Sequence, residues 1–217
     1  MFFSRVKLDL SLLDQPMWQK WLTAQPYASH QWLWQLFPQN DKRQFLFRHQ
    51  ASLSGAFFYV LSEQSPETHH NIFQIETKLF NPQLAVGMKL FFSLRANPVV
   101  TRGGKRSDIL MDAKYHAKKQ GIDREEWKPI QEAAALQWLK MQGERKGFQL
   151  NSDNCHVINY QQQKFVKPQC HKSIAFGSVD FEGELTVMEP ALFQQMLIEG
   201  LGKSRSLGCG LMLIRRG

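Results

Sequence analysis

Two side chains near the N-terminus could together move protons at a phosphate. Tyr27 and His30 stand three residues apart in Tyr27-Ala-Ser-His30, so on a helix they would share one face. An imidazole exchanges a proton near neutral pH, and a phenol beside it can orient a hydroxyl or a phosphate oxygen. RNA cleavage without a metal needs these functions, because the attacking 2′-hydroxyl loses a proton and the leaving 5′-oxygen gains one. A helix histidine with no chemical role is the alternative that the spacing leaves open.

A glycine-rich run near the C-terminus, Gly200-Leu-Gly-Lys-Ser-Arg-Ser-Leu-Gly-Cys-Gly210, could approach a phosphate chain closely. Its Gly202-Lys203-Ser204 step is not a nucleotide-triphosphate loop, because that motif needs a glycine where Leu197 stands. The side chains that would add donors and charge are Lys203, Ser204, Arg205 and Ser206. A helix cap at Gly200 followed by a tight turn is the structural alternative.

Two further basic stretches could bind phosphates. The segment 101–106 has the composition of a mobile phosphate-binding loop, with Arg102, Lys105 and Arg106 as its cations. The segment 161–172 lies between two expected strands and could enter the groove edge of an RNA stem, where phosphates crowd. Its cations are Lys164, Lys167 and Lys172. Either stretch could instead be a solvated surface without a partner.

A zinc site is suggested by Cys155-His156 and Cys170-His171 but is not expected. Neighbouring residues on a strand point to opposite faces, so the four side chains cannot converge easily, and their spacing matches no zinc pattern. We therefore expect no metal and no other cofactor.

The alternation of apolar and polar residues predicts the elements that must position these groups. Strands are expected at 2–10, 45–49, 57–61, 73–78, 88–100, 155–160, 174–187 and 208–214. Helices are expected at 16–37, 128–142 and 190–199, the first broken at Pro26. Any helix between 62 and 71 must be short.

Each half of the chain then fits the order βαββαβ of a ferredoxin-like, RRM-like domain. The sequence predicts an α+β fold with two such domains in tandem, at residues 1–84 and 85–217. The boundary is placed near 81–87, where Pro82 and Gly87 interrupt the pattern.

The charge of the chain favours an anionic partner. The 27 Lys and Arg residues exceed the 19 Asp and Glu residues and give a formal net charge of +8. Such an excess is typical of nucleic-acid binding. We find no signal-peptide pattern, no apolar run long enough to span a membrane, and an odd number of cysteines, so we expect a cytoplasmic protein without membrane contact.

Several segments together resemble a known family. They are His30-Gln-Trp-Leu-Trp-Gln-Leu-Phe-Pro38, Phe45-Leu-Phe47, Leu94-Arg-Ala-Asn-Pro98, Val179-Asp-Phe-Glu-Gly-Glu-Leu185 and the closing run from Gly200 to Leu211. In this order the chain is similar to the CRISPR repeat-processing endoribonucleases of type I-E systems, the CasE family, over both halves of its length.

The resemblance implies a metal-independent endoribonuclease that cuts precursor CRISPR RNA at the 3′ base of the repeat stem-loop and leaves a cyclic phosphate. It also implies that the protein stays on the hairpin of the mature RNA and joins the other subunits of the complex called Cascade. The family's catalytic histidine falls on His30, its helper tyrosine on Tyr27 and its basic loop residue on Arg205. This chain differs by extra residues before His30, including Trp18 and Trp21, and by a less arginine-rich hairpin.

Two other classes of function remain open at this point. A non-catalytic RNA-binding scaffold could have the same fold, because a fold does not specify chemistry. An enzyme acting on nucleotides or other small molecules lacks a fitting motif.

Overall fold

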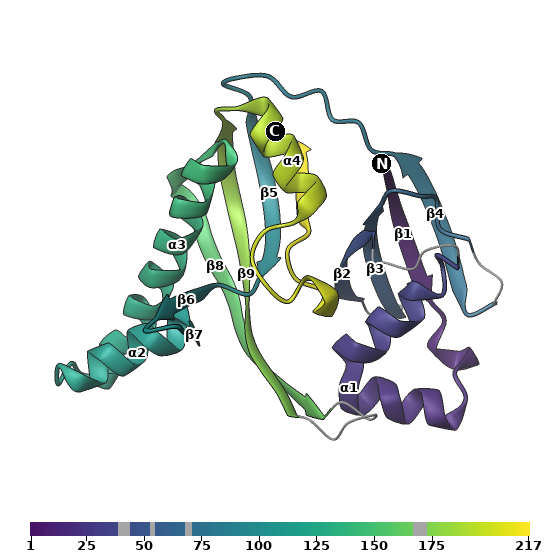
Figure 1. Cartoon of the computed structure of the whole chain (residues 1–217), viewed down its shortest axis with the longest axis horizontal. Helices are drawn as coiled ribbons and strands as arrows, with labels where there is room; N and C mark the ends of the chain where they lie inside the picture. Colours follow the sequence, from purple (N-terminus) through teal and green to yellow (C-terminus); the bar gives the residue numbers. More distant parts are fainter. Residues whose placement is uncertain (39–43, 53–54, 68–70, 167–172) are drawn as a thin grey trace.

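The structure is a computed structural model that describes residues 1–38, 44–52, 55–67, 71–166 and 173–217 (Figure 1). Its first sheet contains β1 (Phe2–Leu8), β2 (Phe45–Ser52), β3 (Gly55–Ser62) and β4 (Phe73–Leu79) in the order β2-β3-β1-β4. Every neighbouring pair is antiparallel, and the buried Val6 of β1 lies opposite Phe58 of β3. This is the strand order that a split βαβ unit produces.

The helix α1 (Gln15–Trp34) covers one face of this sheet (Figure 1) and begins at Asp14, whose carboxylate accepts a hydrogen bond from the Met17 amide. It follows a short 3-10 turn, η1 (Leu10–Leu12). The predicted break at Pro26 lies instead at Ala24, where φ is −145° and ψ is 41°. The difference has a simple cause, since proline is tolerated in the first turn of a helix and therefore follows the break.

The second sheet repeats the same order with β5 (Lys89–Ala96), β8 (Phe148–Val166), β9 (Ser173–Val187) and β10 (Met212–Arg216), arranged β10-β5-β9-β8. The helices α3 (Trp127–Lys146) and α4 (Pro190–Glu199) supply Trp138 and Phe193 to the core, against Phe181 of β9. The predicted class, two ferredoxin-like units in tandem, is confirmed. In the first unit, however, the residues described between β3 and β4 form no helix.

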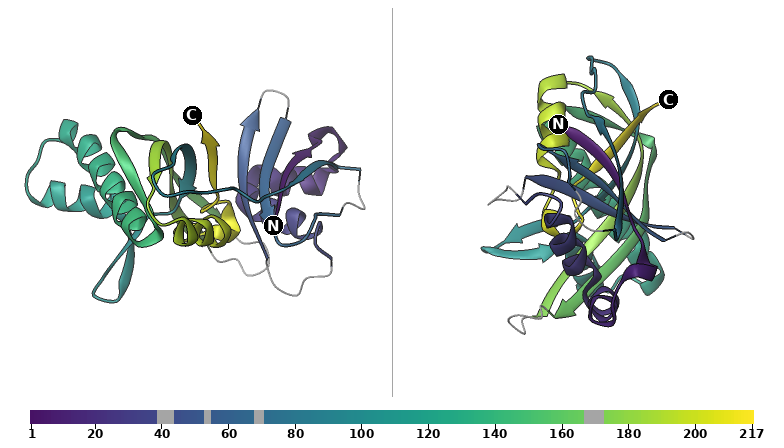
Figure 2. Two further views of the ribbon diagram at one scale, coloured as in Figure 1. Left: turned by 90° about the horizontal axis from the view of Figure 1, so that it is seen from above. Right: turned by 90° about the vertical axis from the view of Figure 1, so that its right-hand side faces the viewer.

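The segment predicted as a mobile basic loop is regular structure. Residues 101–106 lie in the hairpin of β6 (Val99–Arg102) and β7 (Lys105–Asp108), and the helix α2 (Ile109–Lys119) and the short turn η2 (Arg124–Glu126) follow. Gly103 and Gly104 have φ of 54° and 76°, the left-handed values that a two-residue hairpin turn requires. Figure 2 shows α2 at the end of the molecule away from the first sheet.

The two units touch at several places, two of which are apolar. Leu46 and Leu61 of the first sheet pack against Leu211, which precedes β10. The ends of β8 and β9 reach α1 (Figure 1), where Ala24 and Tyr27 contact Phe165. The chain passes between the units after β4 ends at Leu79 and before β5 begins at Lys89. None of the described helices is long and apolar enough to cross a membrane.

Candidate active site

His30 lies on the second piece of α1, at the edge of an open cavity of about 550 Å³. Its ring is half-buried and meets the Trp34 ring edge-on at 5.4 Å and the Phe45 ring at 6.2 Å between centroids. These rings fix the plane of the imidazole. The cavity is lined by Lys20, Tyr27, His30, Gln31, Trp32, Trp34 and Gln35.

Tyr27 lines the same cavity, so the structure brings together the two residues that the spacing paired. Its ring is buried against Phe165 of β8, and its hydroxyl oxygen accepts a hydrogen bond of 2.8 Å from the Gln31 amide. The Lys20 ammonium lies 5.7 Å from the centre of the Tyr27 ring. Packing and hydrogen bonding therefore hold the phenol in one direction beside His30.

Arg205 lies in the turn η3 (Arg205–Leu207) and is not among the described residues that line this cavity. Its guanidinium donates to the carbonyl of Glu199 at 2.6 Å and to that of Gly202 at 3.2 Å. A cation is favourable there because the last carbonyls of α4 carry partial negative charge. The turn itself is close to α1, since Leu207 packs on the cluster that contains Tyr27.

The rest of the glycine-rich run is held by Asn97, a buried residue after β5. The Asn97 amide donates to the Ser204 hydroxyl at 2.7 Å. Ser204 has φ of 55° and is the one non-glycine residue with positive φ among those described. Lys203 is exposed and Ser206 half-buried, so both can meet a ligand from outside.

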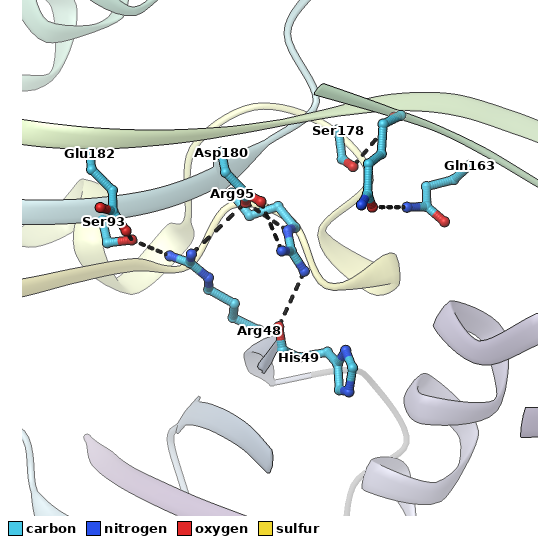
Figure 3. Close-up of polar contacts among 9 residues, drawn as sticks. Arg48, His49, Ser93, Arg95, Gln163, Ser178, Asp180 and Glu182 are labelled. Carbon is cyan, nitrogen blue, oxygen red and sulfur yellow. Dashed lines mark hydrogen bonds and ion pairs between the residues drawn. The ribbon is translucent and has the colours of Figure 1, made fainter. Parts of the chain in front are cut away.

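A group of polar and charged side chains, which we call the junction network, joins the two units (Figure 3): Arg48, Ser93, Arg95, Asp180 and Glu182. Arg48 is buried, Arg95 and Asp180 are half-buried, and Glu182 is exposed. Arg95 of β5 makes two parallel bonds to the Asp180 carboxylate, at 2.8 and 2.9 Å, and a third to the carbonyl of His49 at 3.2 Å. Arg48 of β2 crosses to the second unit and donates to Ser93 at 2.9 Å. A single carboxylate thus lies between two guanidinium groups, one from each unit.

The junction network perturbs the groups around it. Burial alone would lower the pKa of Arg95, but the bonds to Asp180 outweigh burial and raise it. Burial lowers the pKa of Arg48, only partly offset by Asp180. Burial and the nearby Arg95 charge lower the pKa of His49 to about 4, so this imidazole is neutral at pH 7. A narrow cavity of about 30 Å³ separates His49 and Arg95 from Ser29, the residue before His30.

Sequence reasoning missed this network, although two of the segments that carry the family resemblance contain its central pair. The signal was an arginine and an aspartate, Arg95 and Asp180, each directly between two apolar residues of a strand. A charge in such a place needs a partner, because an unpaired buried charge is very costly. Sequence alone does not say which partner it has.

The predicted RNA-binding cations lie on two separate surfaces. Lys105 and Arg106 are exposed on β7, and Arg102 belongs to the facing strand β6, on the opposite side of the β8–β9 hairpin from α1 (Figures 1 and 2). Lys164 is exposed near the end of β8, close to Phe165 and therefore to α1. Lys167 and Lys172 lie outside the described residues.

Within the described ranges, no three side chains of metal-ligand type converge. Cys155 is buried, and burial raises its pKa to about 11, whereas its neighbour His156 is exposed. The two side chains therefore face opposite ways, as alternation along a strand requires. Cys170 and His171 lie outside the described residues.

Two antiparallel sheets of identical strand order, with an open histidine–tyrosine cavity on the first helix, define a tandem ferredoxin-like protein. A family model described as "CRISPR associated protein" matches residues 1–216, and the chain belongs to this family. CasE of Escherichia coli strain K12, a CRISPR system Cascade subunit, is 33% identical over 190 residues, which cover 86% of this chain and 89% of that protein. The resemblance seen in the sequence is thereby confirmed.

Solved structures share the fold across the whole chain. A CRISPR endoribonuclease Cse3 bound to a 19-nucleotide RNA has a TM-score of 0.77 at 21% identity and covers 99% of this chain and 100% of its own. Cse3 of Thermus thermophilus, bound to an RNA representing a pre-cleavage complex, has a TM-score of 0.76 at 20% identity, with 99% and 98% covered. Cas6e of Escherichia coli K-12 has a TM-score of 0.62 at 23% identity, with both chains fully covered at 100%.

Proposed function

We propose that this chain is an endoribonuclease that cuts precursor CRISPR RNA at the 3′ base of the repeat stem-loop. It leaves a 2′,3′-cyclic phosphate, needs no metal, and stays on the hairpin as a subunit of a type I-E surveillance complex in the cytoplasm. The observation that carries this proposal is the placement of Tyr27 and His30 in one open cavity on α1. Membership of the family and the likeness to proteins named as RNA-bound endoribonucleases support it.

The proposed reaction is an internal transfer at one phosphate. The 2′-hydroxyl loses its proton and its oxygen bonds to phosphorus, while the bond from phosphorus to the 5′-oxygen breaks and that oxygen takes up a proton. His30 moves one of these protons. Tyr27, whose direction Gln31 fixes, orients the 2′-hydroxyl. The products are a cyclic phosphate and a 5′-hydroxyl, with no net change in protons.

The RNA stem would be held along both basic surfaces. Lys164 lies near α1 and would contact the backbone close to the cut, together with Lys167 and Lys172 of the same hairpin. Lys203, Ser204 and Ser206 would contact it from the glycine-rich run, where Arg205 would help to stabilise charge at the phosphate. Arg102, Lys105 and Arg106 would extend the contact away from the site. Binding through phosphates should weaken steeply with salt.

The test is a cleavage assay in excess EDTA on the host repeat hairpin, with a second copy that has a 2′-deoxy sugar at the cut. We expect the wild type to cut only the all-ribose RNA. His30→Ala should bind this RNA with unchanged affinity and cut it at least about 1,000-fold more slowly. A wild type that binds the hairpin without cutting it would instead identify an RNA-holding scaffold.

A further inference from the structure

The cavity around His30 contains a cation that the sequence pattern did not indicate. Lys20 belongs to the first piece of α1, in the region where this chain has extra residues before the histidine. It precedes Tyr27 by seven residues, about two helical turns. The bend at Ala24 lies between them, and the Lys20 ammonium sits 5.7 Å from the centre of the Tyr27 ring. Lys20 is half-buried and lines the cavity with His30.

Transfer at a phosphate needs a cation at this place. As the 2′-oxygen bonds to phosphorus, negative charge builds on the non-bridging oxygens, and a preorganised positive group lowers the barrier. Arg205, the basic residue that the family resemblance indicates, has its guanidinium on the carbonyls of Glu199 and Gly202. Among the described residues that line the cavity, Lys20 alone has a permanent charge.

We propose that Lys20 is a catalytic residue whose ammonium contacts the non-bridging oxygens of the scissile phosphate. The inference rests on the proposed function and adds a residue to it. Because Lys20 is only half-buried and its ammonium lies 5.7 Å from the ring centre, its contact with the Tyr27 ring is weak. The contact with Tyr27 thus keeps Lys20 near the site, and a phosphate replaces it at little cost. The long side chain and its three donors suit a phosphate that changes shape during the reaction.

The experiment measures single-turnover cleavage in EDTA with enzyme in large excess over the repeat hairpin. Lys20→Gln should lower the cleavage rate about 100-fold, the effect expected for one lost charge-stabilising donor. Its affinity for the 2′-deoxy hairpin should stay within about threefold of the wild type, because one phosphate contact contributes little to the total. Lys20→Arg should keep most of the rate, since the charge is retained.

The matched control is Lys89→Gln, which removes the same charge from an exposed position at the start of β5. It should cut at the wild-type rate. Thermal unfolding of each variant shows whether a lower cleavage rate comes from the lost charge or from a destabilised helix. Lys20→Gln should unfold within a few degrees of the wild type.

His30→Ala in the same assay separates the two proposals. If Lys20→Gln cuts at the wild-type rate while His30→Ala is inactive, the role of Lys20 is wrong and the proposed function stands. If Lys20→Gln weakens binding but cuts normally once bound, Lys20 is a binding residue and the inference is overturned. A wild type without activity overturns both proposals.

Discussion

The cavity around His30 and the junction network are built in opposite ways, although the small cavity beside the junction network reaches Ser29, the residue before His30. In the junction network, Arg95 makes three hydrogen bonds and Arg48 is 5% exposed. The His30 cavity is open, and the contact of its cation with the described residues is with the Tyr27 ring. We infer that the junction network is rigid, whereas the side chains that line the His30 cavity can move. Substitutions in the junction network should change stability, and substitutions in the cavity should change rate.

The largest effect on stability is expected from Asp180→Asn. The change leaves the guanidinium groups of Arg48, which is buried, and Arg95, which is half-buried, without their carboxylate. Breaking a largely buried pair in this way costs about 3–5 kcal/mol of unfolding free energy. Urea unfolding measures the loss. The control is Glu76→Gln, which breaks the exposed Arg5–Glu76 pair at 2.9 Å and should cost less than about 1 kcal/mol. Equal losses in the two variants would show that the junction network is not rigid.

Acidification should lower the stability of the folded chain through His49. Because its pKa is about 4 when folded and about 6.5 when unfolded, the unfolded chain takes up the proton first as pH falls. The neutral His49 therefore favours the folded chain fully above pH 6.5. This contribution to the free energy of unfolding, about 3 kcal/mol, is lost as the pH falls from about 6.5 to 4. Urea unfolding of the wild type and His49→Gln at pH 7 and 4.5 isolates this residue. The wild type should lose more stability on acidification, and parallel losses would contradict the assignment.

A smaller loss, about 1–3 kcal/mol, is expected from Asn97→Ala, which removes the hydrogen bond to Ser204 from a buried position. Because Ser204 then keeps its positive φ without support, the turn that follows should loosen. Hydrogen exchange at 203–207 would report this. Asn97→Asp retains an acceptor but lacks the amide donor, so it should not restore protection.

The smallest change in free energy is expected from Tyr27→Phe, which removes only the hydroxyl from the cavity. The cleavage rate should fall about tenfold, or about 1.4 kcal/mol, while the midpoint of unfolding stays near that of the wild type. Single-turnover assays and thermal unfolding on one preparation give both values. A variant that unfolds several degrees lower would place Tyr27 with the structural residues instead.

The sequence predicted the parts of this arrangement that depend on local pattern. The helix α4 has the predicted bounds, because proline begins it at Pro190 and Gly200 ends it. The pairing of Tyr27 with His30 follows from helical spacing alone. The sequence predicts a loop at 101–106 because both strands of the hairpin β6–β7 are short and residues 101–106 are polar or glycine, although Gly103-Gly104 is a turn signal.

The parts that could not be predicted depend on distant contacts. Arg95 and Asp180 are separated by 85 positions, and each strand offers other possible partners until the register is known. The position of Lys20 beside Tyr27 depends on the bend at Ala24, whereas the sequence predicts the bend at Pro26. The hydrogen bond from Arg205 to the Glu199 carbonyl depends on how the glycine-rich run turns after α4.

The alternating contacts of β9 limit the insertions and deletions that this strand can accept. In order along one strand, Phe176 packs in the cluster beside α1 and Asp180 joins the junction network, while Phe181 and Leu185 enter the core of the second unit. Successive side chains on a strand face opposite ways, so one inserted residue between Phe176 and Asp180 would turn one set of contacts to the wrong face. Insertions and deletions there can be tolerated only in pairs, or where a bulge absorbs the extra residue.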